Sequence, residues 1–443
     1  MAFDIRETAF KLPENWKLVR LGDIAKVNEK SLTKKSQPDF IRYIDISSVS
    51  TGAFDTPKLL KKDEIPSRAK RILRNNDFII STVRPNLKQF SFIEEAQENL
   101  IASTGFCVIS SNNSKLAWYL YSLITSDLFT EYLVKIADGG AYPAFNPKEI
   151  EDAIIPLPDK DNLEFISDTS RFFHKKIQLN TQINQTLEQI AQALFKSWFV
   201  DFDPVRAKVQ ALSDGLSLEQ AELAAMQTIS GKTPEELTAL SQTQPERYAE
   251  LAETAKAFPC EMVEVDGVEV PKGWEYQYLK DICNIVYGKN LPTTKLIKEG
   301  YPVFGGNGVI GYYDKFLYET PQTLVSCRGA ASGKVLYSLP YSFVTNNSLV
   351  IEHEKSGLSY FYIYEVLKLQ NLTELTSGSA QPQMTIANMA AVQILVPSKK
   401  INEVCKKYLG ILYNQIYQNN IENETLANTR DLLLPKLLSG EIS

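Results

Sequence analysis

The sequence predicts a mixed α/β (α+β) fold with a pseudo-two-fold internal repeat, in which two similar globular halves are joined by two long antiparallel coiled-coil helices. A helical segment at residues 173–198 occurs again at residues 412–437, with matching residues 239 positions apart. A second motif, P-x-x-W-x(4)-L-x-D-I, begins at Pro13 and again at Pro271. Motifs that recur at both ends of a segment indicate a duplicated architecture.

The two helical segments have a stripe of seam residues at alternating steps of four and three. In the first copy the stripe is Phe173, Ile177, Asn180, Asn184, Leu187, Ala191, Leu194 and Trp198. In the second copy it is Leu412, Ile416, Asn419, Asn423, Leu426, Arg430, Leu433 and Leu437. Such a stripe needs a partner helix, so the two helices are expected to pack on each other. Paired buried Asn residues would fix the register, whereas a solvated edge is the alternative interpretation.

Between the opening motif and the helix, each half has short apolar runs typical of strands and longer amphipathic segments typical of helices. The expected strands are residues 78–80, 106–109, 323–325 and 348–351. The expected helices are residues 116–135 and 357–372. After each helix comes a Gly/Pro-rich loop, at residues 139–146 and again at residues 378–385. A short strand that ends in proline follows each loop, at residues 154–158 and 394–397.

The chain is too long for one domain, so we expect several. The predicted division is a first globular half (residues 1–159), a first long helix (160–200), a connector (201–262), a second half (263–397), and a second long helix with a tail (398–443). A helix of residues 160–199 would be about 60 Å long at about 1.5 Å per residue. The connector is acidic and is expected to be mostly helical, with breaks at Gly215, Gly231 and Pro234.

Composition excludes several classes of protein. No apolar run reaches the roughly 18 residues of a membrane span, and the charged N-terminus has no apolar signal core. The five cysteines are widely spread without a CxxC pair, so neither a disulfide framework nor a zinc site is expected, and a cytoplasmic location fits. The net charge of −6 does not by itself indicate nucleic-acid binding, so charge has to be examined segment by segment.

The chain resembles the specificity (S) subunits of type I restriction-modification systems. The resemblance depends on the two opening motifs, the glycine-proline loops, the segment QALFKSWFVDFDPVRAK (192–208) and the segment NTRDLLLPKLLSGEI (428–442). It implies two target recognition domains that each bind one half of a bipartite asymmetric DNA site. It also implies paired helices that act as a spacer and dock two methyltransferase (M) subunits, with a restriction/translocase (R) subunit joining through the complex.

Candidate DNA contacts in the first half lie in a basic stretch, residues 58–88. The candidates there are Arg68, Arg71, Arg74, Arg84, Asn86 and Lys88. Cations contact phosphates, and forked polar side chains contact base edges. The turn TVRPNLK (82–88) is the sharpest element, because it follows a strand and contains a stiffening proline. The alternative is an ordinary solvated basic face.

The other candidates lie in loops. SCRGAASGK (326–334) also follows a strand and offers Arg328, Ser332 and Lys334. Loops rich in glycine or amides add Tyr142, Asn146, Asn307, Asn346, Asn347, Gln381 and Gln383. Glycines let a backbone approach a duplex closely, but they also serve ordinary turns, which is the alternative for each loop.

We expect no catalytic role and no cofactor on this chain. The tetrapeptide [ND]PP[YFW] of amino-methyltransferases is absent, and GAASGK (329–334) is one residue short of a P-loop. S-adenosylmethionine is expected on the partner methyltransferase subunit. One alternative is a DNA methyltransferase with fused recognition domains, and another is a coiled-coil scaffold that binds no DNA. The turn WFVDFDPVR (198–206) and the tail LLPKLLSG (433–440) are expected either to contact partners or only to cap the bundle.

Overall fold

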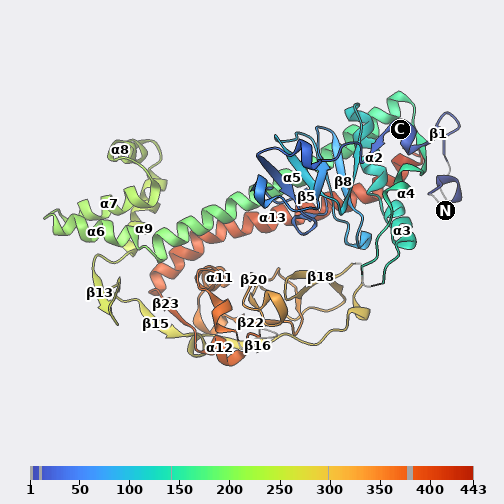
Figure 1. The fold of residues 1–443 in the computed structure, drawn as a ribbon. Helices are drawn as coiled ribbons and strands as arrows, with labels where there is room; N and C mark the ends of the chain where they lie inside the picture. Colours follow the sequence, from blue (N-terminus) through green and yellow to red (C-terminus); the bar gives the residue numbers. More distant parts are fainter. Residues whose placement is uncertain (1–2, 9–11, 141, 298, 377–382, 443) are drawn as a thin grey trace. The chain divides into compact units, whose positions relative to one another are not determined.

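The computed structural model describes residues 3–8, 12–140, 142–297, 299–376 and 383–442 (Figure 1). The chain forms two compact units, Met1–Ile183 with Asn419–Ser443, and Asn184–Gln418. Each unit therefore contains one globular half and one part of each long helix. Among the described residues, no helix combines the length and the apolar character that crossing a membrane requires.

The described part of the first unit contains two four-stranded sheets. One has the order β6 (Lys58–Lys61), β3 (Phe40–Ile44), β10 (Leu100–Ser103), β7 (Ala69–Ile72). The other has the order β2 (Lys26–Val27), β11 (Phe106–Ser110), β8 (Asp77–Ser81), β9 (Phe90–Ile93). Thus the strands expected at 78–80 and 106–109 are confirmed as parts of β8 and β11, which pair antiparallel.

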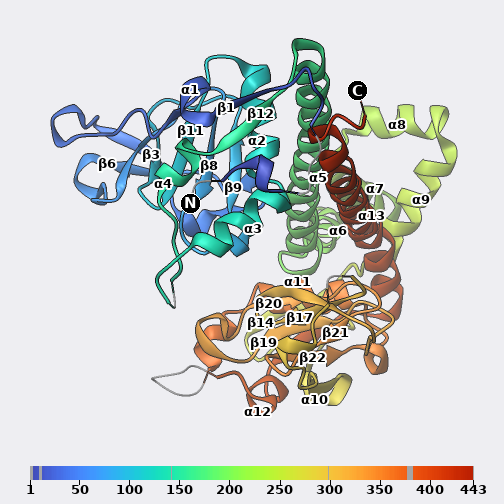
Figure 2. The same cartoon turned by 90° about the vertical axis from the view of Figure 1, so that its right-hand side faces the viewer.

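Alternation along β8 and β11 explains why both strands are buried on both faces. Ile79 and Val108 belong to the core that includes Leu100 and Ala102 of β10. Ile80 and other residues on the opposite face belong to a second core, shared with the helices. Successive side chains of a strand point to opposite faces, so each strand serves two cores. The helix α2 (Ser114–Ile124) lies against β8 (Figure 2).

The prediction of a single helix at residues 116–135 is wrong, because two helices occupy this segment. They are α2 and α3 (Asp127–Ile136), and the break lies at Ser126. The Ser126 hydroxyl accepts a hydrogen bond from the Phe129 N–H at 3.3 Å, so it caps the start of α3. The apolar pattern continues through this break, so the pattern alone did not indicate where the first helix ends.

The opening motif and the proline-ended strand form one antiparallel ladder in each half. In the first unit β1 (Lys17–Arg20) pairs with β12 (Ile154–Leu157). In the second unit β15 (Glu275–Tyr278) pairs with β23 (Gln393–Val396). The motif tryptophans directly before β1 and β15 are buried, with Trp16 7% exposed and Trp274 2% exposed. The repeat therefore exists in structure as well as in sequence.

The second unit has its own two larger sheets within the described residues. One has the order β16 (Asn284–Tyr287), β22 (Ser348–Glu352), β19 (Thr323–Ser326), β20 (Val335–Tyr337). The other has the order β18 (Gly308–Tyr313), β17 (Tyr301–Gly305), β21 (Phe343–Val344). The strands expected at 323–325 and 348–351 are confirmed as parts of β19 and β22. The helix expected at 357–372 is shorter, because α11 (Tyr360–Lys368) begins after the Ser359 cap.

The long helices are α5 (Lys160–Phe199) and α13 (Lys399–Leu438). In the first unit, Asn180 is 2% exposed, and its Nδ2 donates to Asn423 Oδ1 at 3.0 Å and to Glu422 Oε2 at 2.7 Å. The predicted pairing of seam asparagines is confirmed for Asn180 and Asn423. Further along the same unit, Ser170 and His174 line a small pocket together with Arg430 and Leu434. Rising numbers on α5 meet falling numbers on α13, so the helices are antiparallel.

The connector is helical, as expected. It comprises α6 (Asp203–Ser213), α7 (Leu218–Ser230), α8 (Pro234–Thr243) and α9 (Pro245–Ala257), followed by the hairpin of β13 (Met262–Val265) and β14 (Val268–Pro271). The breaks fall where predicted, because Gly215 and Gly231 have φ values of +81° and +66° and Pro234 begins α8.

The aromatic and leucine side chains suggested as partner contacts are buried within the chain. Phe199 and Phe202 pack against Trp274, at ring-centroid distances of 5.9 and 5.6 Å, in the core of the second unit. Leu434 and Leu437 are buried in the core of the first unit. These four side chains therefore pack within the chain, and partner contact by the rest of the two segments stays a prediction.

Candidate nucleic-acid interface

The loop of residues 82–88 in the first unit leaves β8 and turns back tightly into β9. Arg84 and Lys88 have φ values of +51° and +49°, and they flank the 3₁₀ turn η5 (Pro85–Leu87). A left-handed conformation costs a residue with a side chain roughly 1–2 kcal/mol. Such backbone strain persists only where the surroundings hold it, and it gathers at functional sites.

The neighbouring Gly/Pro-rich loop supplies that support. The Arg84 N–H donates to the Pro143 carbonyl at 2.7 Å, and the Phe145 N–H donates to the Thr82 carbonyl at 3.0 Å. The Cζ atom of Arg84 lies 4.2 Å from the ring centroid of Tyr142, which is a cation–π contact. Tyr142 is 67% exposed, so the stacked pair lies at the surface. The structure thus brings together two candidates that are far apart in sequence.

The other candidates near this loop differ in their surroundings. Asn86 is exposed on the 3₁₀ turn. Lys88 Nζ lies 2.5 Å from Asp127 Oδ1, in a surface ion pair. Asn146 has a structural role, because its Oδ1 accepts a hydrogen bond from the Lys148 N–H at 3.0 Å and so caps α4 (Pro147–Glu151).

The three arginines around β7 do not form one cluster. Arg68 is exposed, and its carbonyl accepts a hydrogen bond from Thr104 N–H at 2.8 Å. The adjacent Gly105 carbonyl accepts from Thr82, so Arg68 lies at the same end of the sheets as the Arg84 loop. Arg71 is half-buried on β7, and within the described residues its Nε has no hydrogen-bond partner.

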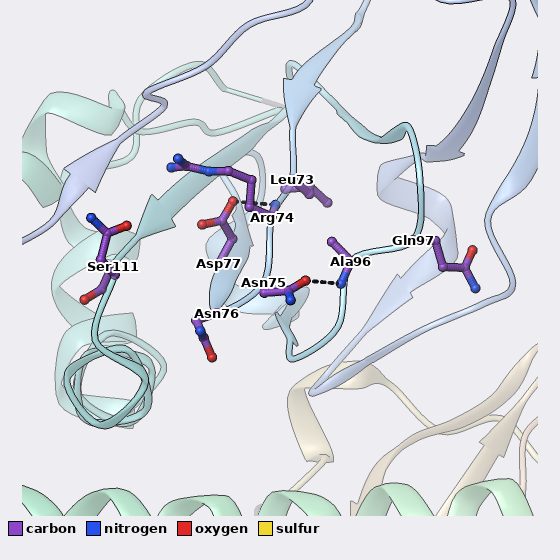
Figure 3. Close-up of a pocket in the computed structure, with 9 residues that line it drawn as sticks. Leu73, Arg74, Asn75, Asn76, Asp77, Ala96, Gln97 and Ser111 are labelled. Atoms are coloured by element: carbon purple, nitrogen blue, oxygen red, sulfur yellow. Dashed lines mark hydrogen bonds between the residues drawn. The ribbon is translucent and has the colours of Figure 1, made fainter.

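Arg74 lies at the opposite end of β8, in a shallow polar pocket (Figure 3). Its N–H donates to Asp77 Oδ2 at 2.8 Å, and its guanidinium forms an ion pair with Glu29. Burial raises the pKa of the Asp77 carboxyl. A five-residue strand spans about 13 Å between its end residues, so Arg74 is remote from the Arg84 loop.

The second half repeats this arrangement with other residues. Arg328 follows β19, as Arg84 follows β8, and it is exposed. It forms an isolated β-bridge with Gln383, and Met384 N–H donates to the Cys327 carbonyl at 3.2 Å. The arginine loop is therefore again bonded to the Gly/Pro-rich loop. Gln381, the other amide predicted in that loop, lies outside the described residues.

Several further candidates gather around Arg328. Lys334 Nζ donates to Asn307 Oδ1 at 2.5 Å, and both residues are exposed. The carbonyl of Asn347 accepts from Cys327 N–H at 2.9 Å, and the carbonyl of Asn346 accepts from the Cys327 thiol at 3.5 Å.

Two residues near this cluster differ from the sequence interpretation. Ser332 is only 4% exposed, so its hydroxyl does not lie at the surface. Lys289 was not among the candidates, yet it is exposed and its carbonyl accepts from Asn346 N–H at 3.1 Å. The signal that could have identified Lys289 is the tripeptide Gly288-Lys289-Asn290 directly after a strand.

Comparison with known proteins decides the family. The model of the type I restriction modification DNA specificity domain matches residues 13–189 and again residues 271–427. This chain belongs to the type I restriction-modification specificity subunits. The HindI specificity subunit of Haemophilus influenzae is 40% identical to it, over 97% of this chain and 100% of that protein.

More distant specificity subunits match along nearly the whole chain as well. The MjaIX specificity subunit of Methanocaldococcus jannaschii is 22% identical, over 98% of this chain and 94% of that protein. Among solved structures, the S subunit from M. genitalium covers 96% of this chain and 97% of that chain, at 15% identity and a TM-score of 0.48.

The family assignment settles the class of function. A specificity subunit is the non-catalytic member of a type I restriction-modification assembly, and S-adenosylmethionine is bound by the methyltransferase subunit. A methyltransferase with fused recognition domains and a scaffold without DNA binding are both excluded. The two matched segments begin at the two opening motifs, Pro13 and Pro271, and the connector of this specificity subunit lies between them.

Proposed function

We propose that residues 1–159 and 263–397 are two target recognition domains, each of which binds one half of a bipartite asymmetric DNA site. One observation carries the proposal. In each half, an arginine loop that follows a buried strand is hydrogen-bonded to a Gly/Pro-rich loop, and the side chains around this junction are cationic or amide-bearing. Arginine and amide side chains suit base edges, and lysines suit phosphates.

The contacts proposed for the first half-site come from Arg68, Arg84, Asn86, Lys88 and Tyr142. Those proposed for the second come from Lys289, Asn307, Arg328, Lys334, Asn346, Asn347, Gln381 and Gln383. Four candidates rank lower: Arg71 is half-buried, Arg74 lies at the far end of β8, Asn146 caps α4, and Ser332 is buried.

The long helices of residues 160–200 and 398–443 are proposed to act as spacer and docking surface. A 40-residue α5 is about 60 Å long, which exceeds the roughly 34 Å between successive major grooves on one face of a duplex. Phe165, Phe172 and Leu179 recur every seven residues on α5 and are exposed, which supports a partner on that face.

The two helices offer quasi-equivalent outer faces, so two copies of the methyltransferase subunit are proposed to bind one S chain. The restriction/translocase subunit joins through that complex. The acidic connector of residues 201–262 faces away from the phosphates, because like charges repel. The assembly is proposed to work in the cytoplasm, where cellular DNA lies.

Half-site substitution tests the proposal. In a complex reconstituted with the methyltransferase subunit, Arg84→Ala should weaken binding only through the first half-site, and Arg328→Ala only through the second. Duplexes with either half-site scrambled, compared across a salt series, measure this. Equal losses at both half-sites for either variant would contradict the assignment of one domain to each half-site.

A further inference from the structure

The Arg84 loop is fixed more firmly than phosphate attraction requires. The Ser81 hydroxyl donates to the Val83 carbonyl at 2.9 Å at its start, and the Thr51 hydroxyl donates to the Lys88 carbonyl at 3.0 Å at its end. The Leu87 N–H donates to the Arg84 carbonyl at 2.9 Å across the turn. Phosphates accept hydrogen bonds from many directions, whereas reading a base edge requires a defined donor position.

The Tyr142 ring restrains the guanidinium as well, because its centroid lies 4.2 Å from the Arg84 Cζ atom. A guanidinium carries five N–H donors in a rigid planar fork, so two parallel donors can serve one ligand while others make further contacts. In the major groove, guanine presents two acceptors, O6 and N7, on one edge, and this pair matches the fork. Adenine presents one acceptor and one donor there, and therefore fits a guanidinium less well.

We propose that Arg84, restrained by its contact with the Tyr142 ring, reads a guanine in the half-site bound by the first recognition domain. This inference rests on the proposed function, because it needs that domain to lie in a major groove. The second domain has no described ring contact of this kind at Arg328, whose loop is bonded to the backbone of Gln383 instead. The proposal therefore concerns the first half-site.

The decisive variant is Arg84→Lys, which keeps the charge and removes the fork. The reconstituted complex of this chain with its methyltransferase subunits is tested on duplexes in which each base pair of the first half-site is changed in turn. The methylome of a host that carries the system supplies the starting sequence. In the wild type, one G·C position should show a penalty of about 5- to 150-fold in binding. In Arg84→Lys this penalty should nearly vanish, while penalties in the second half-site remain.

Tyr142 provides a second measurement. Tyr142→Ala should reduce discrimination at the same G·C position, and Tyr142→Phe should keep it, because the stacking ring is retained. Arg247→Lys on α9 is the matched control, and it should change nothing.

Three results would overturn the assignment. The first is unchanged discrimination in Arg84→Lys. The second is an equal loss of affinity for every duplex, which would indicate a phosphate contact instead. The third is a lost penalty at a position other than G·C. If the wild-type complex showed no sequence preference at all, the proposed function itself would fall, and the guanine assignment with it.

Discussion

His174 of α5 and Tyr413 of α13 occupy matching positions in the two long helices, 239 residues apart, yet they contact their globular halves by different chemistry. His174 packs against Trp118 and Tyr121, at ring-centroid distances of 5.1 and 5.6 Å. Tyr413 packs against Phe361, at a ring-centroid distance of 5.4 Å, and also donates a hydrogen bond at 2.5 Å to Glu365, a carboxyl that is 1% exposed. Both contacts are aromatic, and the difference is the buried polar bond that only the second contact adds.

By contrast, the β1–β12 and β15–β23 ladders are alike in both halves, with four residue pairs each. A ladder is made by backbone groups, which every sequence supplies, so its side chains can vary freely. A helix–helix contact is made by side chains, and it must fit the particular half that packs on it. The comparison teaches that the repeated frame combines backbone ladders and a few shared motif residues, while the side chains that meet each recognition domain differ.

The largest expected effect comes from replacing the two motif tryptophans. Trp16→Ala and Trp274→Ala should each destabilise their own half by about 3–5 kcal/mol, since both rings are buried. Trp274→Ala should cost more, because its ring packs against both Phe199 and Phe202. Hydrogen exchange followed separately in each half measures the two losses of stability. A larger loss for Trp16→Ala than for Trp274→Ala would contradict this expectation.

Acid should destabilise the first half through His174. Burial lowers the pKa of His174 from an ordinary 6.5 to about 4, so the folded state binds fewer protons than the unfolded state between these values. The stability that depends on neutral His174 is therefore fully present above about pH 6.5 and is lost as the pH falls to about 4. The free energy of unfolding should fall by about 3 kcal/mol over this range. His174→Gln should remove this pH dependence, which hydrogen exchange in peptides from the first half would measure. If the stability of that half still fell between pH 6.5 and pH 4 in the variant, the assignment to His174 would be wrong.

The buried bond in the second half should be worth less. Tyr413→Phe removes the donor to Glu365 and should cost about 1–3 kcal/mol. Burial raises the pKa of Glu365, so the folded state favours the protonated carboxyl and loses stability as the pH rises through that raised value. The penalty of Tyr413→Phe should accordingly grow with pH. Adding Glu365→Gln should reduce it, and denaturant unfolding at several pH values would show whether it does.

The smallest effect is expected at the surface of the helix pair. Lys176 Nζ lies 3.1 Å from Glu422 Oε1, and both side chains are largely exposed. Solvent and salt screen such pairs, so Lys176→Met should change the melting temperature of the first half only slightly. Asn180→Ala, which removes the buried hydrogen bond between Asn180 and Asn423, should lower this melting temperature clearly more. The reverse order would show that the exposed pair, rather than the buried amides, joins the helices there.

Most of the proposed contacts were already candidates from the sequence, because arginines after apolar runs are visible locally. At some candidate positions the structure gives the side chain a role in the fold. Asn146 caps α4, and Ser332 is buried under its own loop. Ser126 divides a helix whose apolar pattern runs on without interruption. Lys289 was not a candidate from the sequence, because its place beside Asn346 depends on pairing between segments that are distant in the chain.

The sequence by itself determined the duplication, the two long helices with their buried asparagines, and the main strands, because these features follow from repeats and periodicity along one segment. Only the tertiary structure decided which loops meet. The Arg84 N–H bonds to the Pro143 carbonyl, which brings Tyr142 to its guanidinium, and Arg328 pairs with Gln383, so segments 50 or more residues apart meet in each half. Such pairing depends on how strands are ordered in a sheet, and no local pattern of residues encodes that order.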